Sequence, residues 1–405
     1  MELKMHCTRK LTDDLYYVGQ SDRRIALFEN VYRLDDGMAY NSYLLLDDKT
    51  VLFDCTDQSV EHQFMENVDH VLDGRKLDYL VLHHMEPDHS GTINELMIRH
   101  PETTIIGTAK AHALLLQFFT FTSEPKFLEV KENDSIETGH HRISFILAPM
   151  VHWPEVMVSY DDTTGTLFSA DAFGTFGALS GNIFADEFDY QHRMLDEARR
   201  YYINIVGKYG PQVQMLLKKA SALDIRRICP LHGPIWREDL GFIIGKYDLW
   251  SRYASEENSV LIIYGSIYGN TENVAQVLST KLAEKGVRNM GLYDVSKTDI
   301  ATLVSEAFKY KTIVFASSSL NAGLFLNMEN LLLDLKAHSF QKRNVALIQN
   351  GSWAPSALRC MSEIFSGMKE IKLIEHTVDI RSSLKESQLE AVDQLADSLV
   401  ATLSC

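Results

Sequence analysis

The chain has 405 residues, of which 45% are hydrophobic and 23% charged, and its formal net charge is −16. This length exceeds what a single hydrophobic core usually serves, so two domains are expected, and the composition is that of an ordinary globular protein. The negative charge argues against nucleic acid as a partner because phosphate backbones would be repelled, and no apolar run is long enough to span a membrane.

The amino-terminal residues MELKMHCTRK lack the apolar segment of a signal peptide. The five cysteines form no CxxC pair, which argues against a disulfide framework and against a rubredoxin or zinc-ribbon module within the chain. We therefore expect a protein of the reducing cytoplasm. The cysteines are Cys7, Cys55, Cys229, Cys360 and Cys405.

Short β-rich runs separated by turn signals fill residues 11–235, with helical patterns among them. The expected strands are Leu15–Val18, Tyr43–Leu46, Val51–Phe53, Tyr79–Leu82, Thr104–Ile106, Phe127–Val130, Ile143–Leu147 and Leu167–Ser169. The expected helices are Ser59–Leu72, Ala109–Phe119 and Phe188–Val206. Strands with interspersed helices predict an α+β domain, an αβ/βα sandwich, over residues 1–250.

A stricter alternation begins after the polar stretch 251–259, which we interpret as a linker. The expected strands are Val260–Tyr264, Gly291–Val295, Thr312–Phe315, Val345–Gln349 and Ile371–Val378. The expected helices are Glu272–Glu284, Ala301–Phe308, Met328–Leu335, Ala357–Phe365 and Lys385–Leu403. Near-continuous apolar strands joined by helices predict an α/β domain, a doubly wound parallel sheet, over residues 260–405.

Four potential metal ligands lie within six residues where the strand Leu80–His83 ends, namely His84, Glu86, Asp88 and His89. Alone, such a run is also typical of a solvated polar loop. Three further candidates, His152, Asp171 and His232, each follow an apolar strand. Because strand ends of one sheet can converge, we expect these residues to meet in one metal site. Mixed histidine and carboxylate ligation favours redox-active iron over zinc.

Three loops of the second domain fall at the carboxyl ends of strands, where such sheets bind ligands. The first loop, Ser266-Ile267-Tyr268-Gly269-Asn270-Thr271, feeds a helix and is typical of a phosphate cradle. It has no lysine and no GxGxxG pattern, which suits the monophosphate of FMN. The same residues are also typical of a helix cap and turn. Candidates for the flavin ring are Ser318, Ser319, Leu320, Asn321, Gly323, Asn350, Gly351, Ser352 and Trp353.

The second domain resembles flavodoxin, and the first resembles the metallo-β-lactamase fold with Glu86 in place of the second histidine of its HxHxDH motif. The pattern His84-x-Glu86-x-Asp88-His89 followed by a flavodoxin-like domain resembles the flavodiiron proteins, also called A-type flavoproteins. The resemblance implies that one iron is bound by His84, Glu86 and His152, that the other is bound by Asp88, His89 and His232, and that Asp171 bridges them. Family members differ in whether the histidine at position 89 binds metal.

The resemblance implies reduction of O2 to water, of NO to N2O, or of both, with electrons passing through FMN to the di-iron centre. It implies a head-to-tail homodimer or a dimer of dimers. We expect a separate electron donor, rubredoxin or reduced coenzyme F420, because no rubredoxin-like segment is present. Three alternatives stay open: a dizinc hydrolase fused to a flavodoxin domain, a non-catalytic electron carrier, and a sensor of O2 or NO.

Other residues near these motifs receive weaker interpretations. Strand alternation turns His83 away from His84, so we expect His83 to pack or to support the site. Tyr201 and Tyr202 lie in a helix that could reach the metals, and we hypothesise a hydrogen-bonding role for either one. The remaining histidines are interpreted as surface or capping residues, among them His62, His100, His141 and His338.

Overall fold

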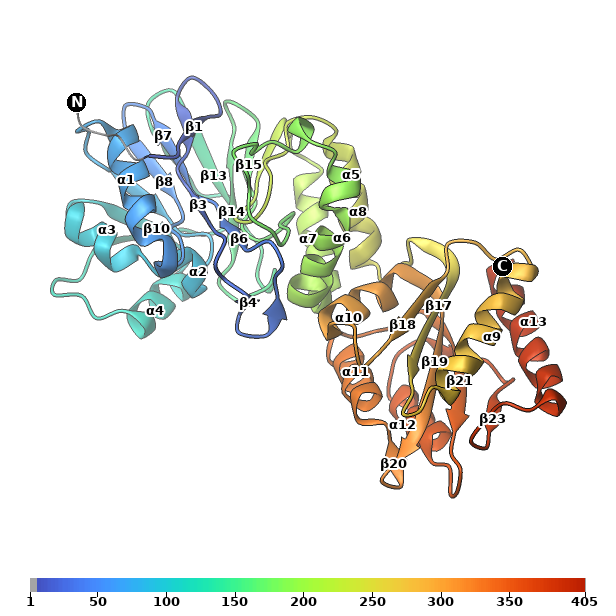
Figure 1. Ribbon diagram of the computed structural model, residues 1–405. Helices are drawn as coiled ribbons and strands as arrows, with labels where there is room; N and C mark the ends of the chain where they lie inside the picture. The colour runs from blue at the N-terminus through green and yellow to red at the C-terminus, as the bar shows by residue number, and fades with distance from the viewer. Residues whose placement is uncertain (1–5, 405) are drawn as a thin grey trace. The chain divides into compact units, whose positions relative to one another are not determined.

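The computed structural model describes residues 6–404, and its chain divides into two compact units (Figure 1). The first unit runs to Tyr202 and resumes over Tyr209–Asp248. The second contains Ile203–Lys208 and the chain from Leu249 onward. The short segment 203–208, which we had assigned to the first domain, is therefore part of the second unit. Among the described residues, no helix combines the length and hydropathy that a membrane span requires.

Two β-sheets form the centre of the first unit. The first sheet has the order β1 (Arg9–Lys10), β2 (Leu15–Tyr17), β7 (Tyr43–Leu46), β8 (Thr50–Phe53), β9 (Tyr79–Val81), β10 (Thr104–Gly107) and β11 (Lys126–Glu129). The second has the order β12 (Ser135–Glu137), β13 (Arg142–Leu147), β14 (Met157–Asp161), β15 (Thr166–Phe168) and β16 (Arg227–Cys229). Two small hairpin sheets pair β3 (Gln20–Asp22) with β6 (Met38–Tyr40) and β4 (Leu27–Phe28) with β5 (Tyr32–Arg33).

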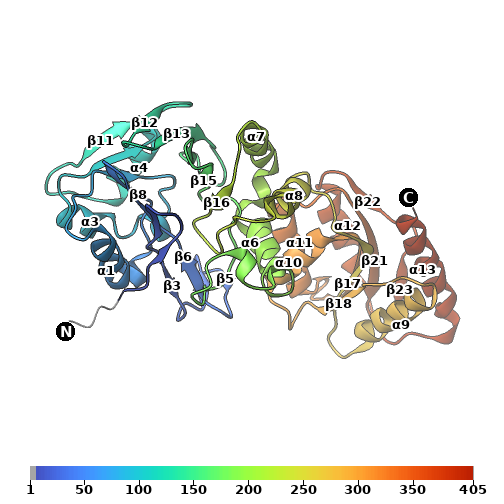
Figure 2. The same ribbon diagram turned by 90° about the horizontal axis from the view of Figure 1, so that it is seen from above.

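Strand alternation explains how these sheets are covered on both faces. Along β7, Tyr43 and Leu45 pack into the core that includes Phe145 and Phe168 of the second sheet, whereas Leu44 packs into the core that the helices cover. Those helices are α1 (Glu61–Leu72), α3 (Ile93–Arg99) and α4 (Ala109–Phe118). Beyond the second sheet lie α6 (Leu195–Tyr201), α7 (Gly210–Ala220) and α8 (Leu240–Ser251) (Figures 1 and 2). The first unit is therefore an αβ/βα sandwich, as predicted.

The second unit is a parallel sheet with helices on both faces. Its strand order is β18 (Gly291–Asp294), β17 (Glu257–Gly265), β19 (Tyr310–Leu320), β21 (Arg343–Asn350) and β22 (Ile371–Leu373). Beside this path, β23 (Val378–Ile380) pairs with β21 in parallel and β20 (Gly323–Leu324) pairs with β19 antiparallel. Both views show α9 (Asn270–Glu284) and α13 (Leu389–Leu403) on one face and α10 (Ile300–Lys309), α11 (Leu326–Ala337) and α12 (Ala357–Ser366) on the other (Figures 1 and 2). The predicted doubly wound sheet is confirmed.

Three element boundaries differ from the sequence-based expectation. The helical pattern Phe188–Val206 is broken into α5 (Tyr190–Arg193), α6 and a π-helical turn at Tyr202–Val206, because the backbone leaves the helical region at Met194. The fifth strand of the second unit is split into β22 and β23. The first strand of the second unit, β17, begins at Glu257, which pairs with Tyr310. This start lies within the stretch 251–259 that we interpret as a linker.

Candidate metal centre and flavin site

The seven predicted metal ligands lie where strands of the first unit end, and all are buried or nearly so. Parallel pairing of β8, β9 and β10 and of β15 with β16 brings their carboxyl ends to one edge of the sandwich. The ligands follow these strands in the chain. They are His84 and Glu86 after β9, Asp88 and His89 in the short helix α2 (Pro87–Ser90), His152 between β13 and β14, Asp171 after β15, and His232 after β16.

Four of these residues form a first set around one point. The Nε2 atoms of His84 and His152 lie 3.1 and 3.0 Å from Oε2 of Glu86. The same two nitrogens lie 3.5 and 3.1 Å from Oδ2 of Asp171. Ligand atoms of all four residues fall within 4.8 Å of one another.

Asp88, His89 and His232 form a second set. Nε2 of His89 lies 3.0 Å from Nε2 of His232, and Oδ2 of Asp88 lies 3.4 and 3.2 Å from these two nitrogens. Oδ1 of Asp171 lies 3.1 Å from Nε2 of His89. Asp171 therefore directs one oxygen to each set, which is the geometry of a bridging carboxylate, and His89 lies with the second set.

Two observations test whether the residues fit a pair of cations. Atoms bound side by side on one ion, with bonds of roughly 2.1 Å at right angles, lie about 3 Å apart, close to the spacings in both sets. In addition, both oxygens of Asp88 and Oδ1 of Asp171 are buried and accept no hydrogen bond from the described residues. Two imidazole nitrogens facing each other and three buried carboxylate oxygens with unmet demand fit two cations with mixed nitrogen and oxygen ligands.

Titration behaviour of the cluster points the same way. Burial by itself would lower the pKa of His89 and His152, but contacts with carboxylates outweigh it and raise the pKa of both to about 9. Burial would raise the pKa of Asp171, but the neighbouring histidines hold it well below its usual value. The cluster is thus a strong binder of positive charge, and metal ions that bind there must displace protons.

Several residues support the site without belonging to either set. Oε1 of Glu155 lies 2.8 Å from Nδ1 of His84, and the carbonyl oxygen of Ala39 lies 2.7 Å from Nδ1 of His232. The carboxyl group of Glu29, a residue in the left-handed region (φ 49°), hydrogen-bonds to Glu86. None of these three was predicted, and no local motif marks Ala39 or Glu29. Only HWPE, which places Glu155 three residues after His152, offered a signal.

His83 occupies the core rather than the site, as predicted. Its ring lies beside the stacked rings of Phe53 and Phe168, nearly parallel to both, and its nitrogens contact Asp54 and, at 2.7 Å, Oγ of Ser159.

Tyr201 and Tyr202 have different surroundings. The Tyr201 ring lies 5.5 Å from the His232 ring, between centroids, and its buried hydroxyl has no hydrogen-bond partner among the described residues, whereas Tyr202 packs against Tyr247.

The other histidines followed the prediction except one. His62 is exposed, and His100 and His338 are the C-cap residues of α3 and α11. The interpretation of His141 as a surface or capping residue was wrong. Its side chain is buried between two carboxylates, at 2.9 Å from both Asp14 and Asp161.

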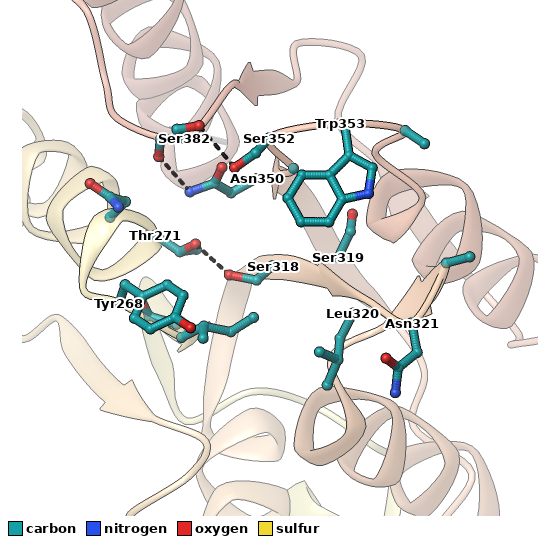
Figure 3. A pocket seen from close by; sticks show the side chains of 16 residues that line it. Tyr268, Thr271, Ser318, Ser319, Leu320, Asn321, Asn350, Ser352, Trp353 and Ser382 are labelled. Atoms are coloured by element: carbon teal, nitrogen blue, oxygen red, sulfur yellow. Dashed lines mark hydrogen bonds between the residues drawn. The ribbon is translucent and has the colours of Figure 1, made fainter.

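The three predicted loops of the second unit line one open pocket (Figure 3). Thr271 and Ser318 are joined through their hydroxyls at 2.8 Å, and Asn350 donates to the carbonyl of Ser382 at 2.9 Å. Two aromatic side chains, Tyr268 and Trp353, flank the pocket and are 91% and 83% exposed. Among the described residues that line it, none is basic. The pocket therefore offers hydroxyls, amides and two aromatic faces, which fits a flavin mononucleotide.

The residues that line the pocket differ in detail from the predicted flavin-binding residues. Gly269 does not line it but is the N-cap residue of α9, in the left-handed region (φ 85°), with its amide donating to Ser266. Gly323 does not line it either, although its hairpin partner Leu320 does. The hydroxyl of Ser319 accepts from the amides of Ser356 and Ala357, at the start of α12. Three lining residues were missed: Ala322, Ala354 and Ser382.

Comparisons with known proteins agree with both units. Residues 38–233 match the family described as ODP family beta lactamase, and residues 262–386 match flavodoxin. An uncharacterized protein of Methanocaldococcus jannaschii is 30% identical over 94% of this chain and 95% of its own. An anaerobic nitric oxide reductase flavorubredoxin of Aeromonas hydrophila is 30% identical over 92% of this chain and 74% of its own.

Solved structures show the same two-unit fold. The rubredoxin oxygen:oxidoreductase of Desulfovibrio gigas has a TM-score of 0.92 and a flavoprotein of Thermotoga maritima one of 0.89. Each is 25% identical to this chain, and each comparison covers 98% of both chains.

A β-lactamase-like sandwich with a buried histidine and carboxylate site, joined to a flavodoxin-like unit, defines a class of metal-dependent flavoprotein oxidoreductases. This chain belongs to one family of that class, the flavodiiron proteins.

Proposed function

We propose that the protein reduces O2 to water, NO to N2O, or both, at a di-iron centre that receives electrons from FMN. The observation that carries the proposal is the pair of ligand sets joined by Asp171, with a carboxylate at position 86. When bound, two irons and FMN supply redox storage for four electrons, the number that full reduction of O2 consumes. Coupling of two NO molecules needs two.

The chain's own residues would hold the two metals and shield them from solvent. His84, Glu86 and His152 would hold one ion, Asp88, His89 and His232 the other, and Asp171 both. Each ion would then have two imidazoles, one carboxylate of its own and one oxygen of Asp171, which leaves room for a small substrate. Rings of Phe28, Tyr40 and Tyr201 lie around His232 with centroids 5.5, 5.9 and 5.5 Å away and shield that side from solvent.

In the second unit, the loop Ser266–Thr271 would hold the FMN phosphate through its hydroxyls, its amides and the N-terminus of α9. Trp353 and Tyr268 would flank the isoalloxazine ring. Asn321 and Asn350 would meet its polar edge, where hydrogen bonds tune the flavin potential.

Electrons must reach the flavin from outside and leave it for the metals. We place the second step in a head-to-tail homodimer, or a dimer of dimers, in which the flavin of one subunit faces the metals of its partner. The exposed Trp353 and Tyr268 support this, because they leave the flavin pocket open to another chain. The donor would be rubredoxin or reduced coenzyme F420, and the protein would act in the cytoplasm.

The proposal is tested by metal and flavin analysis of anaerobically purified protein, followed by O2 and NO consumption with a chemically reduced donor. We expect two irons and one FMN per chain, and turnover of at least one of the two gases. Two zinc ions without flavin, in protein produced with iron available, would instead indicate a hydrolase.

A further inference from the structure

A buried carboxylate, Glu155, stands directly behind one histidine of the first ligand set. Its Oε1 lies 2.8 Å from Nδ1 of His84 and accepts the amide of Met85 at 2.9 Å. The side chain is fully buried, and Oε2 has no hydrogen-bond partner among the described residues. Within residues 6–404, His84 is the one ion-pair partner of Glu155. A buried carboxylate is costly unless something nearby uses its charge.

The contact determines how His84 is presented. A carboxylate accepts but does not donate, so Nδ1 of His84 must carry the proton. Nε2, the atom that faces Glu86 and Asp171, then has the lone pair that can bind a metal. A negative group hydrogen-bonded to the far nitrogen also makes the imidazole a stronger ligand.

The second set has no such support. Nδ1 of His232 contacts the neutral carbonyl of Ala39 at 2.7 Å, and Nδ1 of His89 is buried without a hydrogen-bond partner among the described residues. The inner ligands cannot account for a difference between the sets, because their types match. Each set has two imidazoles, one carboxylate of its own and one oxygen of Asp171.

We infer that Glu155 is a positioning residue that makes the two metal positions unequal: the ion at His84, Glu86 and His152 is held more tightly, and the ion at Asp88, His89 and His232 leaves first. The inference rests on the proposed dimetal function and extends it to the order of metal loss. Loss of an outer carboxylate partner weakens metal binding by about 10- to 100-fold in comparable sites, which sets the expected size.

The test uses the full-length protein loaded with two ferrous ions and dialysed anaerobically against graded concentrations of a chelator. Bound iron per chain is then measured. We expect two steps, separated by about ten-fold or more in chelator concentration. In crystals of the half-depleted protein, anomalous scattering should locate the remaining iron at His84, Glu86 and His152. If the wild-type protein loses its iron in a single step, or keeps iron at the other position, the inference is overturned.

Glu155→Gln isolates the charge, since glutamine keeps an acceptor oxygen for His84 and Met85. We expect the tighter step to move to about ten-fold lower chelator or further, so that the two steps merge. The matched control is Asp54→Asn, because Asp54 likewise contacts both the backbone amide and Nδ1 of a neighbouring histidine, but that histidine, His83, lies in neither set. It should leave the separation unchanged. Merging in the control, or an unchanged separation in Glu155→Gln, contradicts the inference.

The two proposals fail in different ways. Protein that contains two irons and one FMN but loses both irons in one step overturns only the inequality. Protein that binds two zinc ions and no flavin overturns the proposed redox function, and the same chelator series, read on zinc, still tests the order of loss.

Discussion

Two consecutive histidines have opposite environments. His83 points into the core beside the stacked rings of Phe53 and Phe168, whereas His84 points to the ligands Glu86 and Asp171. The reason is the alternation of side chains along an extended backbone. A second local feature precedes Asp171. Ala170 adopts a left-handed conformation (φ 50°), and Asp171 follows it after the end of β15. Such strained positions are typical of functional sites.

Asp171→Asn tests the bridging carboxylate at this scale. Asparagine keeps the shape but offers one oxygen and no charge, so neither ion receives the shared anionic ligand. We expect bound iron to fall below one per chain, as measured by metal analysis, with an unchanged circular dichroism spectrum. Asp162→Asn, on the turn between β14 and β15, is the control and should retain two irons. Two tightly bound irons in Asp171→Asn would contradict the bridging role.

The tyrosine pair provides its own control. Tyr201 contacts His232 and has a buried hydroxyl with no hydrogen-bond partner in residues 6–404, while Tyr202 packs on Tyr247. A hydrogen bond from Tyr201 to a charged reacting group contributes about 1.5–3 kcal/mol. Tyr201→Phe should therefore lower turnover by roughly ten-fold or more at unchanged iron content, and Tyr202→Phe should not. Equal turnover in both variants would remove the proposed role.

At the scale of elements, the loops after β17, β19 and β21 form the flavin pocket because parallel strands end at one edge. Trp353 is 83% exposed, so its removal should leave folding intact. Trp353→Ala should weaken FMN binding by about two- to twelve-fold, corresponding to the 0.5–1.5 kcal/mol of a stacked aromatic pair. Flavin fluorescence titration of the deflavinated protein measures this. Leu326→Ala, another exposed apolar position, should leave the affinity unchanged.

A second element-scale feature is the turn between β12 and β13, which joins the two sheets through His141. Burial lowers the pKa of His141, but hydrogen bonds with Asp14 and Asp161 outweigh this and raise it above its ordinary value. For Asp14, burial raises the pKa, but bonds from Thr12 and His141 outweigh that and lower it. The charged contact thus stabilises the fold most between about pH 4 and pH 6.5. Its contribution disappears as pH rises through the raised pKa of His141 or falls through the lowered pKa of Asp14.

His141→Gln tests this contact. We expect it to reduce the free energy of unfolding by about 2 kcal/mol at pH 6 and by less at pH 9, because the charged contact weakens as pH rises through the raised pKa of His141. Urea unfolding at the two pH values measures the difference. His62→Gln, at an exposed position, should have no effect at either pH. A loss that is equal at both pH values would show that the imidazole contributes only as a neutral group.

At the scale of the whole molecule, the proposed transfer of electrons between subunits requires an assembly. The chain has a mass of 46.0 kDa. Sedimentation equilibrium of the protein with FMN and iron should give about two or four times this mass at micromolar concentration. A monomer that turns over at full rate under the same conditions would contradict the head-to-tail arrangement.

The sequence by itself predicted both folds and all seven residues that gather in the two ligand sets. It could do so because periodic apolar runs determine local strands and helices, and because the ligands follow strand ends that a sheet brings together. Only the tertiary structure decided which residues surround the site. Glu155 reaches His84 across 71 positions, Ser382 completes the flavin pocket, and His141 is buried between Asp14 and Asp161. Such contacts join residues that are distant in sequence, and they depend on how whole elements pack, which no local pattern records.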